Sequence, residues 1–470
     1  MKFPLSLLKK FISFNKDYTQ EELAKEITNL GFEVEAVSNP AEKYKNFVVA
    51  EIVESAKHKE SEKLSLCKVS TGNALLSVVC GAKNARGGIK VVLAKIGAIV
   101  PANNMEIKKG VIRGEASEGM LCSASELALS DDAEGIIELP SDAKIGMDFA
   151  EYLKLDDPIF EISITPNRGD GACVYGIARD LVAKNFGVLN SFPVGNLAVK
   201  GKLEVILGED LPEVYFAKAV LKSDFNEVEE SLKTYSNIWG SSGITSVDFI
   251  NLQMFMYGMP MHIYDASKIE GKIQIRRSLE GEDFVPIKGD PFKLSAGLLV
   301  VADDSKILSL LGVMGDARSK TESTTKEVLI EALFVEPLEV IKSSRSTGIK
   351  SDSSYRFERG VDRRQEQVLS NTLQLITQET KAVFAFKKVE SKREIKFNLE
   401  DYKKRIGYEI DAIRAQNILL SLGFEVQSSG NILKVKVPFF RHDISIWQDI
   451  CEELARIEGY EKIKPLPLNV

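Results

Sequence analysis

Four carboxylates lie within eleven residues near the end of this 470-residue sequence, at Asp443, Asp449, Glu452 and Glu453. The last three have i, i+3 and i+4 spacing, so a helix would place them on one face. The same stretch offers only Arg441 and Arg456 as counter-charges. Mg²⁺ takes oxygen ligands and often uses one or two carboxylates plus waters, so this acidic edge is a candidate magnesium site. The alternative is a solvated amphipathic helix whose polar face is acidic.

A second candidate for chemistry is a basic window between Lys83 and Arg113, which holds seven basic residues against the single acid Glu106. The whole chain has a net charge of −7, which excludes bulk attraction to nucleic acid and leaves only a local patch. Five side chains in this window are candidates for phosphate contacts with little base reading: Lys83, Arg86, Lys108, Lys109 and Arg113. The alternative is a solvated basic face.

The composition excludes several classes of protein. With 44% hydrophobic and 27% charged residues the sequence is typical of globular proteins, and it contains no apolar run of the ~18 residues that cross a bilayer. The N-terminus is too soon interrupted by charge for a signal peptide, so we expect a cytoplasmic protein without membrane contact. Five scattered cysteines and three histidines argue against a disulfide framework or a zinc site.

These candidate residues need elements that position them, and the basic window follows a β-rich stretch. Short apolar runs begin at Phe47, Leu64, Leu75 and Ile89 and are separated by glycine and polar turns. Strands at this spacing predict a small barrel, and an oligonucleotide-binding barrel of five strands has roughly this length. The basic window would then lie on the second half of that barrel, where phosphate contacts are needed.

One helix-turn-strand design occurs twice. Residues 17–31 predict a helix that begins at Asp17 or Thr19 and ends at Gly31, followed by a strand over 32–37. Asp411 opens a second helix, and the pentapeptide 422–426 repeats 30–34 residue for residue. The identical position of the pentapeptide at a helix end predicts a shared fold.

The sequence as a whole predicts a multidomain α+β protein. Residues 158–187 become helical after Pro166, and residues 200–390 mix strands and helices as one α+β domain. We expect an N-terminal helix-strand module over 1–38 and 151–200, with the barrel inserted at 39–150. A central mixed domain follows over 201–390, and a small α+β domain with the acidic helix occupies 393–470.

Several stretches together resemble the beta chain of bacterial phenylalanine–tRNA ligase, and the resemblance runs along all 470 residues. They are residues 80–86 and 113–123 of the barrel, 164–170 with 176–179, 260–265 and 354–362. The acids Asp443, Asp449, Glu452 and Glu453 match the magnesium-binding spacing of this family.

The resemblance implies a subunit of an aminoacyl-tRNA synthetase. The alpha subunit of this family carries the ATP-dependent attachment of phenylalanine to its tRNA, and it completes the magnesium site. This sequence has no phosphate-cradling Gly-x-x-x-x-Gly-Lys loop, which agrees with that division. The expected partners are tRNA, bound by the barrel, and the alpha subunit, in a tetramer of two alpha and two beta chains. Family members continue into a catalytic-like module and an anticodon-binding domain, which we do not find in this sequence.

The resemblance also implies an editing activity, the hydrolysis of tyrosine wrongly attached to the phenylalanine tRNA. A site that hydrogen-bonds the tyrosine hydroxyl can select it strongly, and the implied acceptor is Glu331. His262 and Asn251 would position water or the ester, and Gly315 would leave room for substrate. The alternative for Glu331 is a strand glutamate that faces solvent or pairs with Arg345.

Three pocket positions depart from the family pattern. Ile250 and Ser351 stand where the family has threonine, and Ser353 stands where it has alanine. Ser351 keeps a hydroxyl, but Ile250 loses a polar group and Ser353 makes the pocket narrower and more polar. Two rival functions therefore stay open. One is a non-catalytic tRNA-binding scaffold, and the other is a two-metal centre for phosphoryl transfer at the four acids.

Overall fold

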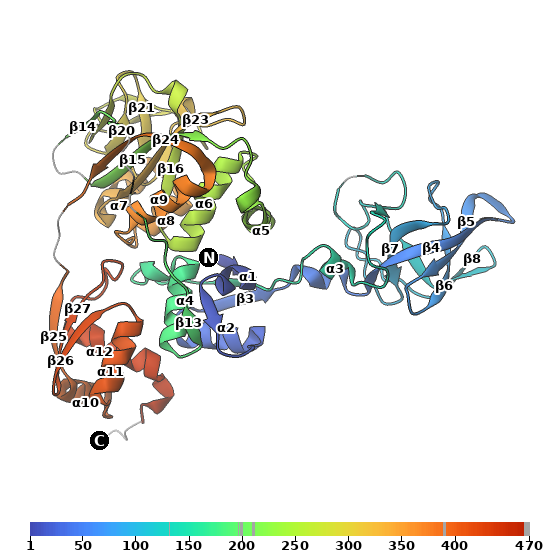
Figure 1. Cartoon of the computed structure of the whole chain (residues 1–470), viewed down its shortest axis with the longest axis horizontal. Helices are drawn as coiled ribbons and strands as arrows, with labels where there is room; N and C mark the ends of the chain where they lie inside the picture. Colours follow the sequence, from blue (N-terminus) through green and yellow to red (C-terminus); the bar gives the residue numbers. More distant parts are fainter. Residues whose placement is uncertain (131, 196, 198–200, 209–211, 389–391, 465–470) are drawn as a thin grey trace. The chain divides into compact units, whose positions relative to one another are not determined.

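The computed structural model describes the chain except residues 131, 196, 198–200, 209–211, 389–391 and 465–470. It divides into two compact units (Figure 1). One unit comprises residues 37–159, and the other comprises residues 1–36 together with 160–470. Helices and strands occur throughout, which confirms the mixed α+β class. Within the described residues, no helix has both the length and the apolar character needed to cross a membrane.

The unit of residues 37–159 is built on one curled antiparallel sheet. Its strand order is β10-β7-β4-β5-β6, and β11 also pairs with β7. The two ends of the sheet meet, since the backbone N–H of Glu118 donates to the carbonyl of Ser77 at 2.9 Å. The prediction of a small barrel is confirmed. The strands are β4 (Phe47–His58), β5 (Ser61–Ser70), β6 (Leu75–Cys80), β7 (Ile89–Lys95), β10 (Gly119–Leu121) and β11 (Glu138–Leu139).

Both faces of strand β4 are covered, which gives this unit two clusters of buried side chains. Val48, Ala50 and Ile52 pack on one side, and Phe47 packs on the other against Phe149. A hairpin and a short helix complete the unit. They are β8 (Gly110–Ile112), β9 (Glu115–Ser117) and α3 (Phe149–Tyr152).

The helix-turn-strand design is present twice in the other unit. Helix α2 (Gln20–Asn29) leads to β3 (Val34–Ser38), and α11 (Ala412–Ser421) leads to β26 (Glu425–Ser429). Both helices end alike, because Leu30 and Leu422 each have φ −78° and ψ −2°. The following glycines have φ +95° and +89°, a left-handed conformation that glycine adopts without strain. The predicted repeat is confirmed, and Thr19 rather than Asp17 caps the first helix.

The N-terminal part of this unit packs around helix α4, in which all but one residue is buried. Strands β1, β12 and β3 form a three-stranded sheet, and β13 pairs with β2. The bounds are β1 (Lys2–Pro4), α1 (Leu5–Lys9), β2 (Ile12–Phe14), β12 (Ile159–Ile162), α4 (Val174–Ala183) and β13 (Gly187–Leu189).

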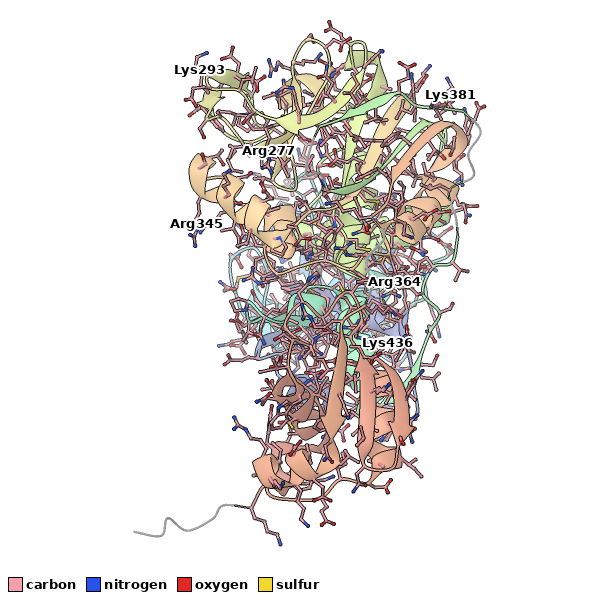
Figure 2. All side chains as sticks on the ribbon, turned by 90° about the vertical axis from the view of Figure 1, so that its left-hand side faces the viewer. Arg277, Lys293, Arg345, Arg364, Lys381 and Lys436 are labelled. Atoms are coloured by element: carbon pink, nitrogen blue, oxygen red, sulfur yellow. The ribbon has the colours of Figure 1, made fainter. Side chains whose placement is uncertain are left out.

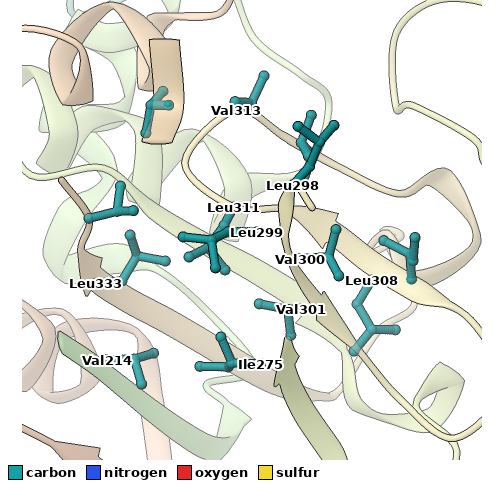
Figure 3. Close-up of a cluster of buried hydrophobic side chains, with 14 of the residues drawn as sticks. Val214, Ile275, Leu298, Leu299, Val300, Val301, Leu308, Leu311, Val313 and Leu333 are labelled. Atoms are coloured by element: carbon teal, nitrogen blue, oxygen red, sulfur yellow. The ribbon is translucent and has the colours of Figure 1, made fainter. Parts of the chain in front are cut away.

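The central region contains two packed sheets. One has the order β16-β23-β15-β24 and the other has the order β14-β17-β20-β21-β22. Apolar side chains from both sheets form one core, in which Val214 and Leu333 gather with Ile275 and Val301 (Figure 3). The strands are β14 (Val205–Leu207), β15 (Glu213–Leu221), β16 (Met261–Asp265), β17 (Ile273–Arg277), β20 (Leu299–Ala302), β21 (Ile307–Leu310), β22 (Met314–Gly315), β23 (Glu327–Phe334) and β24 (Thr377–Phe386).

Helices and one hairpin complete the central region. The helices are α5 (Glu229–Trp239), α6 (Thr245–Tyr257), α7 (Pro337–Thr347), α8 (Asp352–Phe357) and α9 (Gln365–Ile376), and the hairpin strands are β18 (Glu282–Phe284) and β19 (Phe292–Leu294). The C-terminal region has a three-stranded sheet of order β25-β27-β26. Its remaining elements are β25 (Glu394–Asn398), α10 (Leu399–Ile406), β27 (Ile432–Lys436) and α12 (Trp447–Glu458).

Candidate functional site

Glu331 lies in the middle of strand β23 and faces the core between the two central sheets. Its neighbours on the same face of the strand, Leu329 and Leu333, belong to the buried apolar cluster. Only 4% of Glu331 is exposed. On the adjacent strand β16 the residue directly opposite Glu331 is His262. The sheet therefore places the predicted acceptor and the predicted histidine side by side.

The carboxylate of Glu331 is held by a tyrosine rather than by a cation. The phenol of Tyr264 donates a short hydrogen bond to Glu331 Oε2. The phenol is also hydrogen-bonded to Ser309 Oγ, from the opposite sheet, at 2.8 Å. Burial raises the pKa of Glu331 to about 7, and the bond from Tyr264 acts in the opposite direction. No basic side chain in the described structure offsets this burial.

Both alternatives for Glu331 are wrong. The side chain is buried, so it does not face solvent. Arg345 is exposed in the last turn of α7 and projects outward from the central region (Figure 2). The reason is the strand alternation, which points Glu331 toward the core with Leu329 and Leu333.

His262 is a neutral imidazole with an unused nitrogen. Burial lowers the pKa of His262 to about 4. Its Nε2 is shielded from solvent and has no hydrogen-bond partner among the described residues. The ring meets the Tyr264 ring edge-to-face at 4.5 Å between centroids. A Cβ added to Gly315 would overlap the His262 ring, so the absence of a side chain at Gly315 leaves the space that this imidazole occupies.

The other two predicted pocket residues have structural partners. Ser351 caps helix α8, and its hydroxyl donates to the carbonyl of Val313 at 2.7 Å. This bond fixes the backbone two residues before Gly315. Asn251 lies on α6 and hydrogen-bonds Tyr235. The structure thus brings together Glu331, His262 and Gly315, with Ser351 as a support and Asn251 engaged elsewhere.

Sequence reasoning missed Tyr264 and Ser309. The signal for Tyr264 was available, because a residue two positions after His262 on one strand must share its face. Ser309 comes from a strand of the opposite sheet, and its pairing with Gly315 across β21 and β22 is a tertiary feature without a local signal.

Glu453, in the acidic helix α12, is buried between two arginines. Arg456 Nε donates to Glu453 Oε1 at 2.8 Å, and Arg441 Nη2 donates to the same oxygen at 2.8 Å. Both arginines also contact Glu453 Oε2. Although burial acts to raise the pKa of Glu453, these two guanidinium groups hold it well below its usual range. The two counter-charges noted in the sequence are therefore the groups that neutralise this acid.

The ion pairs continue from α12 into the N-terminal part of the same unit. Arg456 also binds Asp180 at 2.7 Å, and Arg168 binds the same oxygen of Asp180 at 2.7 Å. Arg168 in turn binds Asp170, which Arg179 contacts at 2.7 Å. All of these side chains are buried. The acidic helix is thus tied to helix α4 by a continuous chain of buried charges.

The expectation that Asp449, Glu452 and Glu453 share one face is wrong. Successive helical residues are rotated by about 100°, so Glu453 faces the core while its neighbour Glu452 is exposed. Asp449 Oδ2 accepts from the backbone N–H groups of Ser445 and Ile446, at 2.7 and 2.9 Å. Asp443 is paired with Arg441 at 2.8 Å.

These four carboxylates do not fit a magnesium ion in this arrangement. Glu453 and Asp443 are bound by guanidinium groups, and Asp449 caps a helix. Across the described ranges, no group of three or more His, Cys, Asp or Glu side chains is arranged to hold a metal ion. The magnesium site at Asp443, Asp449, Glu452 and Glu453 stays a prediction.

Three of the five candidate cations in the basic window of the barrel are paired with acidic side chains. Arg86 forms a two-point pair with Glu138 at 2.7 and 2.8 Å, and Lys109 pairs with Glu118 at 2.9 Å. Both acids come from outside the window. Lys108 pairs with Glu106 at 2.9 Å. The two remaining candidates, Lys83 and Arg113, are exposed and have no acidic partner in the described part of the chain.

Family models match three parts of the chain. Residues 47–148 match a tRNA-binding domain, residues 217–381 a B3/4 domain, and residues 395–460 a tRNA synthetase B5 domain. A solved N-terminal fragment of the phenylalanyl-tRNA synthetase beta subunit from Pyrococcus horikoshii covers 97% of this chain at 13% identity, with a TM-score of 0.43. That score is too low to support an inference.

Curated relatives match the chain over its whole length. The phenylalanine–tRNA ligase beta subunit of Rickettsia conorii is 37% identical over 503 aligned residues, and that of Bartonella quintana is 36% identical over 487. The chain spans 61% and 60% of these two relatives, respectively. By sequence and by domain content, the chain belongs to the phenylalanine–tRNA ligase beta-subunit family over the part of those relatives that it matches.

Proposed function

We propose that this chain binds tRNA and hydrolyses tyrosine from wrongly charged phenylalanine tRNA. The observation that carries the proposal is Glu331, a buried carboxyl group with no cation against it, directly opposite a neutral histidine with a free nitrogen. Burying a carboxyl group without a counter-charge costs several kcal/mol, and the bond from Tyr264 offsets only part of that cost. Recognition of a substrate phenol is a function that accounts for a carboxyl group at this position.

The roles of the pocket residues follow from their protonation states. His262 stays neutral at physiological pH because its pKa is lowered to about 4, so it is a weak base and a good hydrogen-bonding group. Its unpaired Nε2 can orient a water molecule or the ester. Gly315 has no side chain and so leaves the His262 ring the space that it needs in the pocket. Glu331 recognises the hydroxyl, and Ser351 and Asn251 support the surrounding backbone and helix.

The partners of the relatives extend this proposal. The chain acts in the cytoplasm with an alpha subunit, in a tetramer of two alpha and two beta chains, and supports ATP-dependent attachment of phenylalanine to tRNA. Magnesium at Asp443, Asp449, Glu452 and Glu453 would require Asp443 and Glu453 to leave their arginines when the alpha subunit binds. The barrel contacts the tRNA backbone through its exposed cations, foremost Lys83 and Arg113.

The test is release of tyrosine from tyrosine-charged phenylalanine tRNA by the 470-residue chain. His262→Ala and Glu331→Ala should each slow the release at least tenfold, because each removes a group that contacts substrate. Tyr215→Phe is the matched control, because Tyr215 lies on the strand next to Glu331 and its buried hydroxyl has no hydrogen-bond partner among the described residues. Equal rates in all forms would contradict the proposal.

A second candidate is a tRNA-binding scaffold without hydrolytic activity. Two observations favour it. Ile250 is 2% exposed and apolar, and Tyr264 already occupies Glu331. Unchanged tRNA affinity in Glu331→Ala, combined with no tyrosine release by any form, would establish this alternative.

A further inference from the structure

The hydroxyl of Tyr264 contacts Glu331, the carboxyl group proposed to recognise the substrate hydroxyl. Tyr264 is fully buried on β16, and its phenol donates to Glu331 Oε2 while it also bonds Ser309 Oγ. Ser309 comes from the opposite sheet, so the phenol is clamped from both sides. The aromatic ring is fixed in turn by edge-to-face contact with His262. The chain thus carries its own phenol on the carboxylate that would recognise tyrosine.

This contact changes how well the site can discriminate. A site that hydrogen-bonds a substrate hydroxyl rejects the analogue without it, because the buried polar group is then left unpaired. In this chain Tyr264 satisfies Glu331 whether or not a substrate hydroxyl is present. A phenylalanyl ester therefore leaves no orphaned carboxylate, and the main penalty against it disappears.

We propose that Tyr264 is a specificity-determining residue that competes with the substrate phenol for Glu331 and so weakens the preference of this site for tyrosine over phenylalanine. The inference rests on the proposed function of the same pocket. The substrate class is the ester between an aromatic amino acid and the terminal ribose of tRNA. Tyr264 acts through Glu331, and Ser309 holds it in the competing position.

The burial of Glu331 strengthens the competition. The bond from Tyr264 favours the ionised carboxylate, which is the form that accepts. A substrate phenol must displace that bond or share the carboxylate with it. Glu331 lies between Leu329 and Leu333 in the core, so water cannot readily take the place of a displaced partner.

The experiment compares Tyr264→Phe with a matched tyrosine variant. Tyr215 is the control, because it is 1% exposed, lies opposite Ala332 on the strand next to Glu331, and has a buried hydroxyl without a hydrogen-bond partner among the described residues. The full chain and each variant are assayed on tyrosyl-tRNA and phenylalanyl-tRNA. Binding of non-hydrolysable amide analogues of tyrosyl-adenosine and phenylalanyl-adenosine is measured in parallel.

Tyr264→Phe should raise the tyrosine-to-phenylalanine ratio of kcat/KM, and of analogue affinity, by roughly ten- to a hundredfold, the value of one hydrogen bond to a charged group. Tyr215→Phe should leave both ratios unchanged. Ser309→Ala, which loosens the phenol without removing it, should raise the ratios by a smaller factor.

The outcomes separate the two claims. A ratio that is unchanged or lower in folded Tyr264→Phe overturns the competition while the parent activity stands. Failure of every form to hydrolyse either ester or bind either analogue overturns the proposed function and the competition with it. If Tyr264→Phe does not fold, Ser309→Ala decides, and an unchanged ratio in that variant also overturns the competition.

Discussion

Glu331 and Glu453 are both glutamates with almost no exposed surface, in the same compact unit, but their surroundings are opposite. Glu453 lies between Arg441 and Arg456, and its pKa is held well below the usual range. Glu331 is held by one phenol, and its pKa is raised to about 7. One carboxyl group is structural and is ionised at neutral pH, while the pKa of the other lies near neutrality.

The immediate neighbours of a buried acid therefore decide whether that acid is structural or available for chemistry. Carboxylates paired with arginine gain charge-assisted hydrogen bonds from a fixed fork and cannot bind a ligand without losing them. A carboxyl group without a cation carries a desolvation cost that a ligand can relieve. By this criterion Glu453 in helix α12 is less available for binding a ligand than Glu331 is.

The largest effect should come from Glu453→Gln. This variant replaces the carboxylate that Arg441 and Arg456 share with a neutral amide, and breaking a buried pair typically costs roughly 3–5 kcal/mol. The two tryptophans separate the regions, since Trp447 begins α12 and Trp239 ends α5. Urea unfolding followed by Trp447 fluorescence in a Trp239→Phe background should show the loss. A loss below about 1 kcal/mol would contradict the structural role.

Glu331→Gln should instead flatten the pH dependence of stability of the central region. Because the pKa of Glu331 is raised from 4.5 to about 7, its stabilisation is complete below pH 4.5 and is lost as pH rises through 7. At about 1.4 kcal/mol per pKa unit, the wild type should lose roughly 3 kcal/mol more than the variant over this range. Unfolding followed by Trp239 fluorescence in a Trp447→Phe background measures it.

The C-terminal region should show the opposite sign. The lowered pKa of Glu453 contributes stability above pH 4.5, and this contribution is lost as pH falls further. The Trp447 transition should therefore weaken in acid, while the Trp239 transition should not weaken through Glu331. If the unfolding transitions reported by Trp447 and Trp239 changed with pH in the same direction, the opposite roles of the two glutamates would be contradicted.

Removing a buried tyrosine hydroxyl should lower stability only where that hydroxyl has a hydrogen-bond partner. Tyr264→Phe loses the hydrogen bonds to Glu331 and Ser309 and should cost roughly 1–3 kcal/mol. Tyr215→Phe removes a buried hydroxyl that has no partner among the described residues, and it should be neutral or slightly stabilising. Thermal unfolding of both variants tests the difference, and equal costs would show that the Tyr264 contacts do not stabilise the fold.

The smallest effect concerns cations in the barrel. Lys83 is exposed without an acidic partner among the described residues, whereas Arg86 is paired with Glu138. Lys83→Ala should weaken tRNA binding evenly across RNA sequences and lower the salt slope by about one charge. Arg86→Ala should lower the slope less, because its charge is already offset. A larger change for Arg86 in salt-dependent binding assays would reverse this order.

Local features were predictable from the sequence, and long-range pairings were not. The repeated helix-turn-strand design followed from a capping residue, a glycine and one pentapeptide, all of which act within a few residues. The barrel strands followed from short apolar runs separated by glycine and polar turns. The family resemblance identified Glu331, His262 and Gly315, which the sheets bring together. The link from Arg456 to Asp180 spans 276 residues, and no local pattern indicates it.

The acidic helix shows why spacing alone misled. Helical spacing placed Asp449, Glu452 and Glu453 near one another, but it did not distinguish a core-facing acid from an exposed one. Glu453 is buried because helix α12 packs against the N-terminal part of the unit. There Asp180, itself bound by Arg168, pairs with Arg456 of the helix. The same limit hid Ser309, which reaches Tyr264 only after the two central sheets pack.

The most direct test of the contrast between the two glutamates is pH-difference infrared spectroscopy of the chain, with Glu331→Gln and Glu453→Gln for assignment. A protonated carboxyl in a dry site has a carbonyl band distinct from that of a carboxylate. We predict such a band that titrates near pH 7, is absent from Glu331→Gln and persists in Glu453→Gln. Its absence near pH 7, or its persistence in Glu331→Gln, would contradict the account.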